Sequence, residues 1–378
     1  MQPVRALHVY SGNLFGGVET MLATLAQYRH FCPDLEAHFA LCYQGRLSEE
    51  LQAAGARTHV LGAVRTSRFW TVQRVRRGLS ELLRSQLYDV VVCHSPWAQA
   101  MFAPVIRRTK LPLVFWLHGV AKGQHWLERW ARMTPPDLAI SNSRFAAKTL
   151  CNLYTNVRVE LLHYPVGIPK NRPCSSEVAS VRAELNTPPN ATVIIQASRM
   201  EALKGHALHV KALGLLRHLP NWICWQVGGA QRLHEARYVE KLKNMAIQYG
   251  VADRLRFLGQ RRDVARLMSA SDIHCQPNQQ PDAFGITFIE ALSARLPVVT
   301  TAMGGALEIV DDSCGMLVPP NDEAALAASL QRLIQSPALR ARLGAGGPAR
   351  AHKLCDPAQQ MARLHTVLTE VTCQRNNR

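Results

Sequence analysis

The sequence predicts an α/β protein built from two doubly wound, Rossmann-like parallel sheets. The prediction rests on the chain's 378 residues, on its nearly half apolar composition, and on short β-branched runs that alternate with helix-length segments. A chain of this length exceeds one typical core and suits two domains of ordinary size. Short apolar runs separated by helices are typical of parallel strands with helices on both faces of the sheet.

The first half of the chain repeats a strand and then a helix. We expect helices at about 18–29, 47–54 and 69–86. The strands are expected within the segments 5–11, 37–43, 57–62, 88–94, 111–119 and 136–143. Proline and glycine then crowd together at 163–169, where we place the linker between domains, so that the amino-terminal domain covers 1–168.

A second alternation of strands and helices follows the linker. Its strands are expected within the segments 192–198, 222–229, 255–260, 272–278 and 296–301. We assign this carboxyl-terminal domain to 169–354, and we expect 356–371 to form a last helix. Two such domains imply a cleft between them, and ligands of doubly wound sheets gather at the carboxyl ends of strands.

Charge, cysteine usage and hydropathy narrow the class of protein. The net charge is +17, which favours anionic partners such as nucleotide phosphates, acidic lipid surfaces or nucleic acid. The ten cysteines form no Cys-x-x-Cys pair, so we expect free, buried thiols in a reducing compartment. No apolar run approaches the roughly 20 residues that span a bilayer, and the first residues do not resemble a signal peptide. We therefore expect a cytoplasmic protein.

The stretch PDAFGITFIEALSARLPVVTTAMGGALEIV, residues 281–310, carries the carboxylates Asp282 and Glu290 around a Phe-Gly turn. A helix that begins near Phe284 would offer unpaired backbone amides to an anion from its first turn. This turn comprises Phe284, Gly285, Ile286 and Thr287. Eight helical residues span about 12 Å, so a nucleotide sugar could place its sugar near Asp282, its diphosphate at the helix start and its ribose near Glu290. The alternative is an ordinary solvated role for both acids.

This motif, an acidic residue followed by x-Phe-Gly-x4-Glu and then by LPVVTTAMGGALEIV, resembles the carboxyl-terminal domain of retaining GT-B fold glycosyltransferases of family 4, also called glycosyl transferases group 1. The resemblance covers nearly the whole chain and is strongest from 192 to 320. In that family the first acid is usually Glu, whereas Asp282 is one methylene shorter. The resemblance also implies that the helix within 355–378 crosses back to the first domain and that the domains close around the donor.

The segment SRMEALKGHALHVKALGLL, residues 198–216, resembles the family segment that grips the donor diphosphate. The resemblance assigns that role to Arg199 and Lys204. Two cations at this place would stabilise the charge that develops as the glycosidic bond breaks. By themselves, both residues would be read as surface charges.

Two further places match the family in the first domain. Gly16 and Gly17 correspond to a loop that faces the donor phosphates, and glycine lets a backbone approach a ligand closely. A Gly-Gly pair alone signals only a tight turn. His118 follows an expected strand where similar proteins place a histidine beside the donor sugar, so we expect it to contact the sugar or the acceptor and not to be the general base. His94 is a weaker candidate for the acceptor side.

Metal and cofactor signals do not occur in the sequence. The chain has no Asp-x-Asp, and His206 and His209 have no third ligand at metal spacing. We therefore expect metal-independent catalysis without a cofactor. The resemblance implies front-face transfer, in which the donor phosphate takes the acceptor proton. It also implies a nucleotide sugar and a saccharide or lipid-linked acceptor as partners, in cell-envelope polysaccharide or glycolipid synthesis.

The expected helix 69–86 is basic and amphipathic. Its apolar residues Val72, Val75, Leu79, Leu82 and Leu83 should pack on the sheet. The basic residues of the surrounding segment are Arg65, Arg68, Arg74, Arg76, Arg77 and Arg84. Together with Phe69 and Trp70 they fit docking on an anionic membrane surface, at the inner face of the membrane. A solvated arginine face is the alternative.

Three other classes of protein are weighed against a transferase. A nucleotide-sugar 2-epimerase shares the fold, but its active-site pattern differs from the motif at 282–290. A non-catalytic nucleic-acid-binding protein would explain the charge, yet the basic residues are dispersed and not interleaved with stacking aromatics. A degenerate glycosyltransferase that binds without transferring would explain Asp282 in place of Glu.

Overall fold

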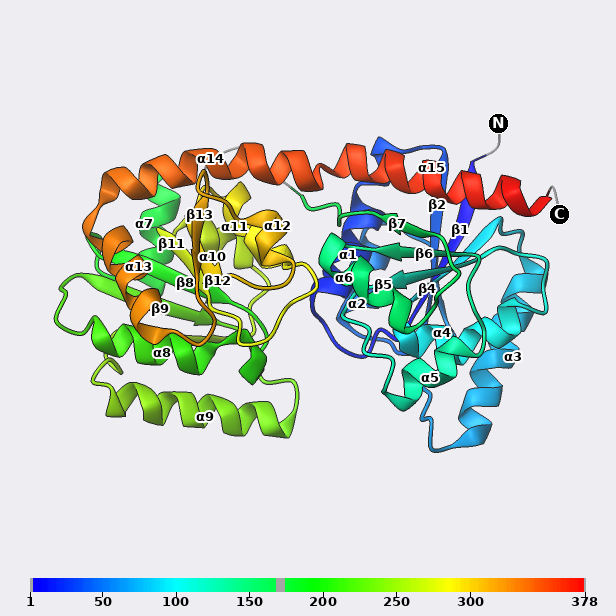
Figure 1. Cartoon of the computed structure of the whole chain (residues 1–378), viewed down its shortest axis with the longest axis horizontal. Helices are drawn as coiled ribbons and strands as arrows, with labels where there is room; N and C mark the ends of the chain where they lie inside the picture. Colours follow the sequence, from blue (N-terminus) through cyan, green and yellow to red (C-terminus); the bar gives the residue numbers. More distant parts are fainter. Residues whose placement is uncertain (1–2, 168–173, 377–378) are drawn as a thin grey trace. The chain divides into compact units, whose positions relative to one another are not determined.

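The computed structural model describes residues 3–167 and 174–376 and divides into two compact units (Figure 1). Unit 1 comprises Met1–Val166 with Cys355–Arg378, and unit 2 comprises Gly167–Leu354. The predicted domain boundary between 168 and 169 lies outside the described residues. Each unit contains one parallel sheet, and this confirms the predicted α/β class with two doubly wound domains.

The sheet of unit 1 has seven strands in the order β3-β2-β1-β4-β5-β6-β7. Its strands are β1 (Val4–Tyr10), β2 (Leu35–Leu41), β3 (Thr58–Val60), β4 (Val90–His94), β5 (Leu113–Leu117), β6 (Leu138–Ser141) and β7 (Val159–Leu161). The central strands β4 and β5 are buried along their whole length, as expected for a sheet covered on both faces. The strand order reverses between β1 and β4, so the connections that follow these two strands diverge.

Helices cover both faces of this sheet. They are α1 (Gly17–Gln27), η1 (Arg29–Phe31), α2 (Arg46–Ala53), α3 (Phe69–Ser85), α4 (Ser95–Ile106), α5 (Trp126–Arg132), α6 (Arg144–Thr149) and η2 (Leu150–Asn152). The three helices expected from the sequence correspond to α1, α2 and α3 within two residues at either end. The apolar positions Val72, Val75 and Leu79 of α3 are fully buried, so the stripe packs inward as predicted.

A ninth helix of unit 1 comes from the end of the chain. The helix α15 (Pro357–Asn376) follows unit 2 in sequence but packs on unit 1 (Figure 1). Its residues Leu364 and Leu368 are fully buried. Arg158, next to β7, forms an ion pair of 2.7 Å with Glu370. Residues of the last helix therefore complete the core of the first unit.

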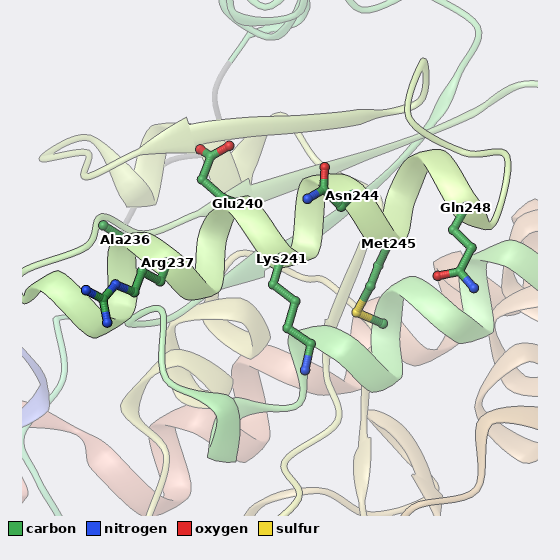
Figure 2. A pocket seen from close by; sticks show the side chains of 7 residues that line it. All are labelled: Ala236, Arg237, Glu240, Lys241, Asn244, Met245 and Gln248. Atoms are coloured by element: carbon green, nitrogen blue, oxygen red, sulfur yellow. The ribbon is translucent and has the colours of Figure 1, made fainter.

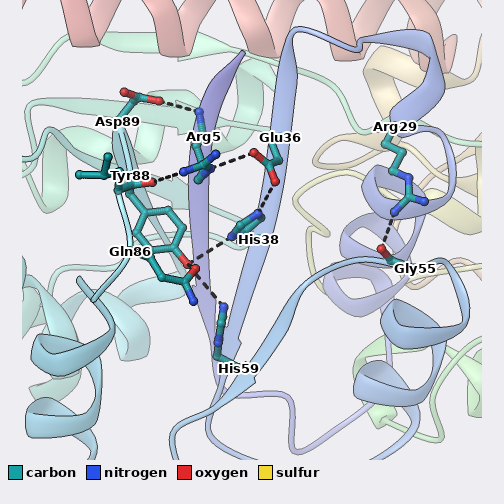
Figure 3. Close-up of polar contacts among 10 residues, drawn as sticks. Arg5, Arg29, Glu36, His38, Gly55, His59, Gln86, Tyr88 and Asp89 are labelled. Carbon is teal, nitrogen blue, oxygen red and sulfur yellow. Dashed lines mark hydrogen bonds and ion pairs between the residues drawn. The ribbon is translucent and has the colours of Figure 1, made fainter. Parts of the chain in front are cut away.

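Polar contacts tie the amino-terminal ends of β1, β2 and β4 together (Figure 3). Arg5 forms a 2.8 Å ion pair with Glu36, and the other carboxylate oxygen of Glu36 lies 2.8 Å from the ring of His38. His38 in turn contacts the hydroxyl of Tyr88, and the Asp89 carboxylate accepts a hydrogen bond from the backbone amide of Arg5. This network lies at the edge of the sheet opposite the carboxyl ends, so we assign it to strand alignment.

The sheet of unit 2 has six parallel strands in the order β10-β9-β8-β11-β12-β13. They are β8 (Thr192–Ala197), β9 (Trp222–Val227), β10 (Leu255–Gly259), β11 (Ile273–Gln276), β12 (Val298–Thr301) and β13 (Gly315–Val318), of which β13 was not predicted. The helices are α7 (Ser175–Glu184), η3 (Ala202–Lys204), α8 (His206–Leu215), α9 (Leu233–Gln248), α10 (Val264–Ser269), α11 (Ile286–Ser293), α12 (Ala306–Ile309), α13 (Glu323–Gln335) and α14 (Pro337–Cys355). The strand order reverses between β8 and β11.

The structure agrees only in part with the expectations for the cysteine thiols and for hydropathy. All ten cysteines are free. The expectation that they are buried is wrong for Cys151, Cys174 and Cys373, which are exposed on helices or loops. Within 3–167 and 174–376, the structure contains no helix with the length and apolar character that a bilayer crossing requires.

Candidate functional site

The loops that follow β8 and β11 carry the predicted charged residues of unit 2. In open parallel sheets a crevice forms where the strand order reverses, because the loops on either side of that point diverge. In unit 2 this point lies between β8 and β11. Arg199 and Lys204 follow β8, and Asp282 follows β11. Residues almost 80 positions apart in sequence are thereby brought to one edge of the sheet.

Lys204 is fixed by its neighbours in the loop after β8. The Gln196 side chain donates a 2.9 Å hydrogen bond to the backbone carbonyl of Lys204. The next residue, Gly205, has a φ of +75°, and a Cβ atom there would lie 1.7 Å from the carbonyl oxygen of Pro277. Only glycine allows this approach of the two loops. Sequence reasoning missed Gln196 and Gly205, although the Lys-Gly pair that opens α8 was a usable signal.

Lys204 and Asp282 form a direct ion pair. The Nζ atom of Lys204 lies 2.5 Å from Oδ2 of Asp282, and the two side chains are only 15% and 25% exposed. The other oxygen, Oδ1, accepts a 2.9 Å hydrogen bond from the backbone amide of Ala283. Burial acts to raise the pKa of Asp282, but Lys204, the Ala283 amide and the charge of Arg199 outweigh it and lower that pKa. Asp282 is therefore an ionised counterion to Lys204 in this structure.

Arg199 is paired more loosely. Its guanidinium lies 2.9 Å from a carboxylate oxygen of Glu201, and its side chain is 38% exposed. An exposed pair of this kind is weak, because solvent screens it and the side chains remain mobile. Arg199 can therefore turn toward an incoming anion at small cost.

The helix α11 begins two residues later than the sequence predicts. It starts at Ile286, with Gly285 as its N-cap at a φ of +109°. A Cβ atom on Gly285 would lie 2.5 Å from the ring of Phe288, so glycine is required there. The side chain of Phe284 is buried in the core, and its backbone belongs to the preceding loop. Ile286 and Thr287 begin the helix and leave the first unpaired amides of its positive end.

Glu290 lies on α11, a little over one turn after its first residue. Its side chain is partly buried. Among the residues that the structure describes, none forms a hydrogen bond or ion pair with its carboxylate. Burial raises the pKa of Glu290 to about 7. A ligand with vicinal hydroxyl groups would supply the hydrogen bonds that the carboxylate lacks.

A Gly-Gly pair holds the loop that carries Asp282. Gly304 has a φ of +61°, and a Cβ atom there would lie 2.5 Å from the Asp282 carbonyl oxygen. The backbone amide of Gly305 donates a 2.8 Å hydrogen bond to the same oxygen. The two glycines therefore fix the position of the carboxylate. They are part of the quoted motif, but the sequence alone did not indicate which residue they support.

The remaining predicted residues belong to unit 1. Gly16 is the N-cap of α1 and Gly17 its first residue, in the connection that follows β1. The φ of Gly16 is −167°, an extended value that any residue adopts, so this backbone angle does not require glycine. His118 follows β5, and both of its ring nitrogens are engaged, with His94 at 2.8 Å and with the Tyr164 hydroxyl at 2.6 Å.

Other side-chain clusters and hollows give weaker evidence for a functional site. His206 and His209 are buried, with His206 3.1 Å from the Ser198 hydroxyl and His209 2.8 Å from the Gln196 side chain. No group of three or more metal-ligating side chains occurs in the described parts of the chain. A hollow of about 740 Å³ lies along α9 and is lined by that helix alone (Figure 2). None of its lining residues belongs to the strand-end loops that carry the charged residues.

Two doubly wound parallel sheets, with charged side chains and a helix start at the reversal point of the second, are typical of the GT-B fold. Comparison with known families agrees with this class. The family model of "Glycosyl transferases group 1" matches residues 178–350, and that of "Glycosyltransferase Family 4" matches residues 15–166. The chain therefore belongs to the group 1 glycosyltransferases with the GT-B fold.

Individual relatives are more distant. The chain is 28% identical over 289 residues to a D-inositol 3-phosphate glycosyltransferase of Nocardioides sp., which covers 68% of this chain and 62% of the relative. It is 32% identical over 168 residues to the lipopolysaccharide core biosynthesis glycosyltransferase LpsD of Rhizobium meliloti, covering 44% of this chain and 46% of that protein. The chain thus matches about half to three fifths of the length of these relatives.

A solved structure supports the fold over nearly the whole chain. The structure of Alr3699/HepE of Anabaena in complex with UDP and glucose matches with a TM-score of 0.84 and 22% sequence identity, over 97% of this chain and 99% of that one. At this identity the likeness defines the fold and not the ligand.

Proposed function

We propose that this protein transfers a sugar from a nucleoside diphosphate donor to a saccharide or lipid-linked acceptor, in the synthesis of cell-envelope polysaccharide or glycolipid. The observation that carries the proposal is the pairing of Lys204 with Asp282 beside the start of α11, at the reversal point of the second sheet. A partly buried lysine at a helix amino terminus is suited to hold a diphosphate. Membership in the glycosyltransferase family and the names of its relatives support the sugar transfer.

Each residue then has a defined role in donor binding. Lys204 leaves Asp282 for the diphosphate, which Arg199 also approaches, and the first amides of α11 donate to the same phosphates. The freed Asp282 carboxylate accepts hydrogen bonds from hydroxyl groups of the donor sugar. Glu290 accepts hydrogen bonds from the ribose hydroxyl groups and becomes ionised when they replace its apolar surroundings. The cations stabilise the leaving diphosphate as the glycosidic bond breaks.

Transfer proceeds with retention and without a metal in this proposal. The leaving phosphate takes the proton of the acceptor hydroxyl on the same face of the sugar, and the two cations replace the charge that a metal would supply. Gly16 and Gly17 allow the backbone of the loop after β1 to approach the donor. The anomeric configuration of the first product, measured by NMR, must equal that of the donor, and activity must survive EDTA.

The first experiment is a thermal-shift panel with UDP, GDP, ADP and dTDP on the wild type and on the variants Lys204→Ala and Glu290→Ala. A nucleotide at 100 times its Kd stabilises the folded chain by about 2.7 kcal/mol, which is enough to raise Tm by a few degrees. Lys243→Ala is the matched control, because Lys243 lies on α9 and pairs with Glu240 of the same helix. One nucleotide should shift the wild type and the control but neither site variant. No shift with any nucleotide would contradict donor binding.

We also propose that α3 docks on an anionic membrane surface, which would place the protein in the cytoplasm at the inner face of the membrane. Phe69 and Trp70 begin this helix and are 69% and 68% exposed. Exposed arginines around them are Arg65, Arg68, Arg74, Arg77 and Arg84. Arg76 leaves the predicted basic face, because it donates hydrogen bonds to the backbone carbonyls of Ala100 and Met101. Aromatic side chains beside cations suit the interface of acidic lipid bilayers.

Co-sedimentation with vesicles tests this docking. The wild type should bind vesicles that contain anionic lipid and should not bind vesicles of phosphatidylcholine alone. The double variant Phe69→Ser with Trp70→Ser should lose most of the binding. Leu233→Ser removes an even more exposed apolar side chain from unit 2 and should change nothing. Binding that does not depend on anionic lipid would contradict the proposal.

A nucleotide-sugar 2-epimerase is the second candidate for the same fold. It would also respond to nucleotides in the thermal-shift panel. Incubation of the donor without acceptor separates the two activities, because an epimerase produces an isomerised nucleotide sugar under these conditions. We expect the donor to be recovered unchanged apart from slow hydrolysis.

A further inference from the structure

Three histidines and a tyrosine of unit 1 form one line of hydrogen bonds, which we name the histidine chain. Nδ1 of His8 lies 2.9 Å from Nε2 of His94, and Nδ1 of His94 lies 2.8 Å from Nε2 of His118. Nδ1 of His118 lies 2.6 Å from the hydroxyl of Tyr164. The imidazole rings are nearly parallel, with centroids 5.1 and 5.0 Å apart and interplanar angles of 25° and 14°. The histidine chain runs across the adjacent strands β1, β4 and β5 at the carboxyl side of the sheet, where the strand order reverses.

The three rings are neutral. Burial is the main cause that lowers the pKa of His8 and of His118 to about 3 and the pKa of His94 well below its ordinary value. Within the described residues, no carboxylate is hydrogen-bonded to any of the three rings. The nearest other rings are Trp116, with centroids 5.4 Å from His94 and 5.5 Å from His118, and Phe39, 5.4 Å from His8. Tyr10 lies perpendicular to His94 at 6.4 Å, and its hydroxyl donates to the carboxylate of Glu19. A positive charge in the chain would lack a counterion.

Hydrogen bonding couples the tautomers of the rings. A neutral imidazole donates through one nitrogen and accepts through the other. If Nδ1 of His118 accepts, its Nε2 carries the proton and donates to His94, which must then donate through its own Nε2 to His8. The three histidines therefore share one tautomer, and the group at the end of the line selects it.

Tyr164 is that group. Its oxygen accepts a 2.8 Å hydrogen bond from the side-chain amide of Asn142. The hydroxyl lies 2.6 Å from Nδ1 of His118, a distance that suits an O–H donor and a nitrogen acceptor. At the other end, Nε2 of His8 is buried and has no partner among the described residues. The histidine chain thus has a hydrogen-bond donor, the Tyr164 hydroxyl, at one end and an unpaired atom, Nε2 of His8, at the other.

We propose that the Tyr164 hydroxyl holds His8, His94 and His118 in the Nε2–H tautomer, and that His94 and His8 are positioning residues for His118. In this state His118 offers only an acceptor nitrogen to a ligand. A sugar hydroxyl that displaces Tyr164 must donate its proton to Nδ1, and the tautomers of the chain then stay as they are. The sugar contact rests on the proposed function, whereas the tautomers do not.

The test is long-range ¹H–¹⁵N correlation NMR on protein labelled with ¹⁵N-histidine, which distinguishes Nε2–H, Nδ1–H and cationic rings. Single His→Gln variants assign the three resonances. In the wild type all three rings should be Nε2–H tautomers and should not titrate between pH 8 and pH 5. An Nδ1–H tautomer or a cation at any of the three positions would overturn the proposal without any variant.

Tyr164→Phe removes the terminal donor and should turn the three resonances into averages of the two tautomers. Tyr154→Phe is the matched control, because Tyr154 is also buried in unit 1 and its hydroxyl donates to the carbonyl of Ala131. The control should leave all three resonances unchanged. Unchanged tautomers in Tyr164→Phe would refute the role of the hydroxyl.

A kinetic measurement addresses the sugar contact separately. If the protein is a transferase, Tyr164→Phe should change KM several fold more than it changes kcat. The pH profile of kcat/KM should show no limb near pH 6.5 in the wild type or in the variant. A pH limb near 6.5 that His118→Gln abolishes would make His118 a proton acceptor and contradict its role as a fixed hydrogen-bond acceptor. The NMR spectra need neither donor nor acceptor, so failure of the histidine chain and failure of the proposed function are distinguishable.

Discussion

Replacing Asp282 by Asn should strengthen the binding of nucleoside diphosphates. In the free protein Asp282 neutralises Lys204 at 2.5 Å, and a diphosphate must take this lysine away from its counterion. The substitution removes the counterion and the repulsion between its charge and the phosphates. At an effective dielectric constant of about 20, unit charges 4 Å apart interact by about 4 kcal/mol. Partial exposure of both side chains and screening by salt reduce the expected gain to about 1–2 kcal/mol, a Kd lower by roughly 5 to 30 fold.

Isothermal titration calorimetry at fixed ionic strength measures this change. UDP or another responding nucleotide is titrated into the wild type, Asp282→Asn and Asp312→Asn. Asp312 is exposed and precedes β13, at the edge of the sheet away from the carboxyl ends, so this variant controls for net charge. The control should bind as the wild type does.

The same titration with the intact nucleotide sugar separates two roles for the carboxylate. If Asp282 also contacts the sugar, the gain should be smaller for the nucleotide sugar than for the diphosphate, because hydrogen bonds to the sugar are lost. Equal or weaker binding of the diphosphate by Asp282→Asn would refute the exchange of Lys204 between carboxylate and phosphate.

Three further predictions concern stability and loop geometry. The pKa of Glu290 in the folded state is about 7, above the ordinary 4.5. Between these two pH values the folded chain keeps a proton that the unfolded chain loses, so the free energy of unfolding falls as the pH rises from about 4.5 to about 7. Glu290→Gln should therefore stabilise the protein by about 2–3 kcal/mol at pH 8 and by little at pH 4, measured by urea unfolding; an equal gain at both pH values would argue against burial as the cause. Gly304→Ala should cost about 1–3 kcal/mol and abolish nucleotide binding, because its Cβ would collide with the Asp282 carbonyl, and a thermal shift equal to that of the wild type would contradict this. A chain that ends at Arg350 lacks Leu364 and the rest of α15, and should be insoluble or expose apolar surface to a fluorescent dye; a soluble chain that unfolds as the wild type does would contradict the packing of α15.

The sequence was sufficient for most of the architecture, because strand position depends on local patterns. Runs such as 192–198 and 296–301 are short, β-branched and bounded by turn residues, and each contains a strand of the structure. The strand β13, Gly315–Val318, was missed because its run is short and begins with glycine. The start of α11 was misplaced because Gly285 adopts a φ outside the right-handed helical range, so the helix begins only at Ile286, and periodicity does not report backbone dihedral angles.

Contacts between side chains of different strands could not be predicted from the sequence. The motif identified Lys204 and Asp282 as separate ligands of a donor, but their pairing depends on β8 and β11 being neighbours although two strands separate them in the chain. The histidine chain is a similar case. His94 and His118 could be noticed as strand-end residues, whereas His8 lies inside a strand pattern and is distinguished only by the register of β1 beside β4. Strand order is a global property that no local pattern reports.

The packing of α15 on unit 1 constrains the order in which the protein can fold during synthesis. Ribosomes extend a chain at about 5–20 residues per second, and domains generally fold as units as they emerge. Here the sheet of unit 1 leaves the ribosome first, but the helix that contributes the buried residues Leu364 and Leu368 arrives only after all of unit 2. The first domain must therefore wait with apolar surface uncovered, and it becomes a client for chaperones over about the time that unit 2 takes to be made.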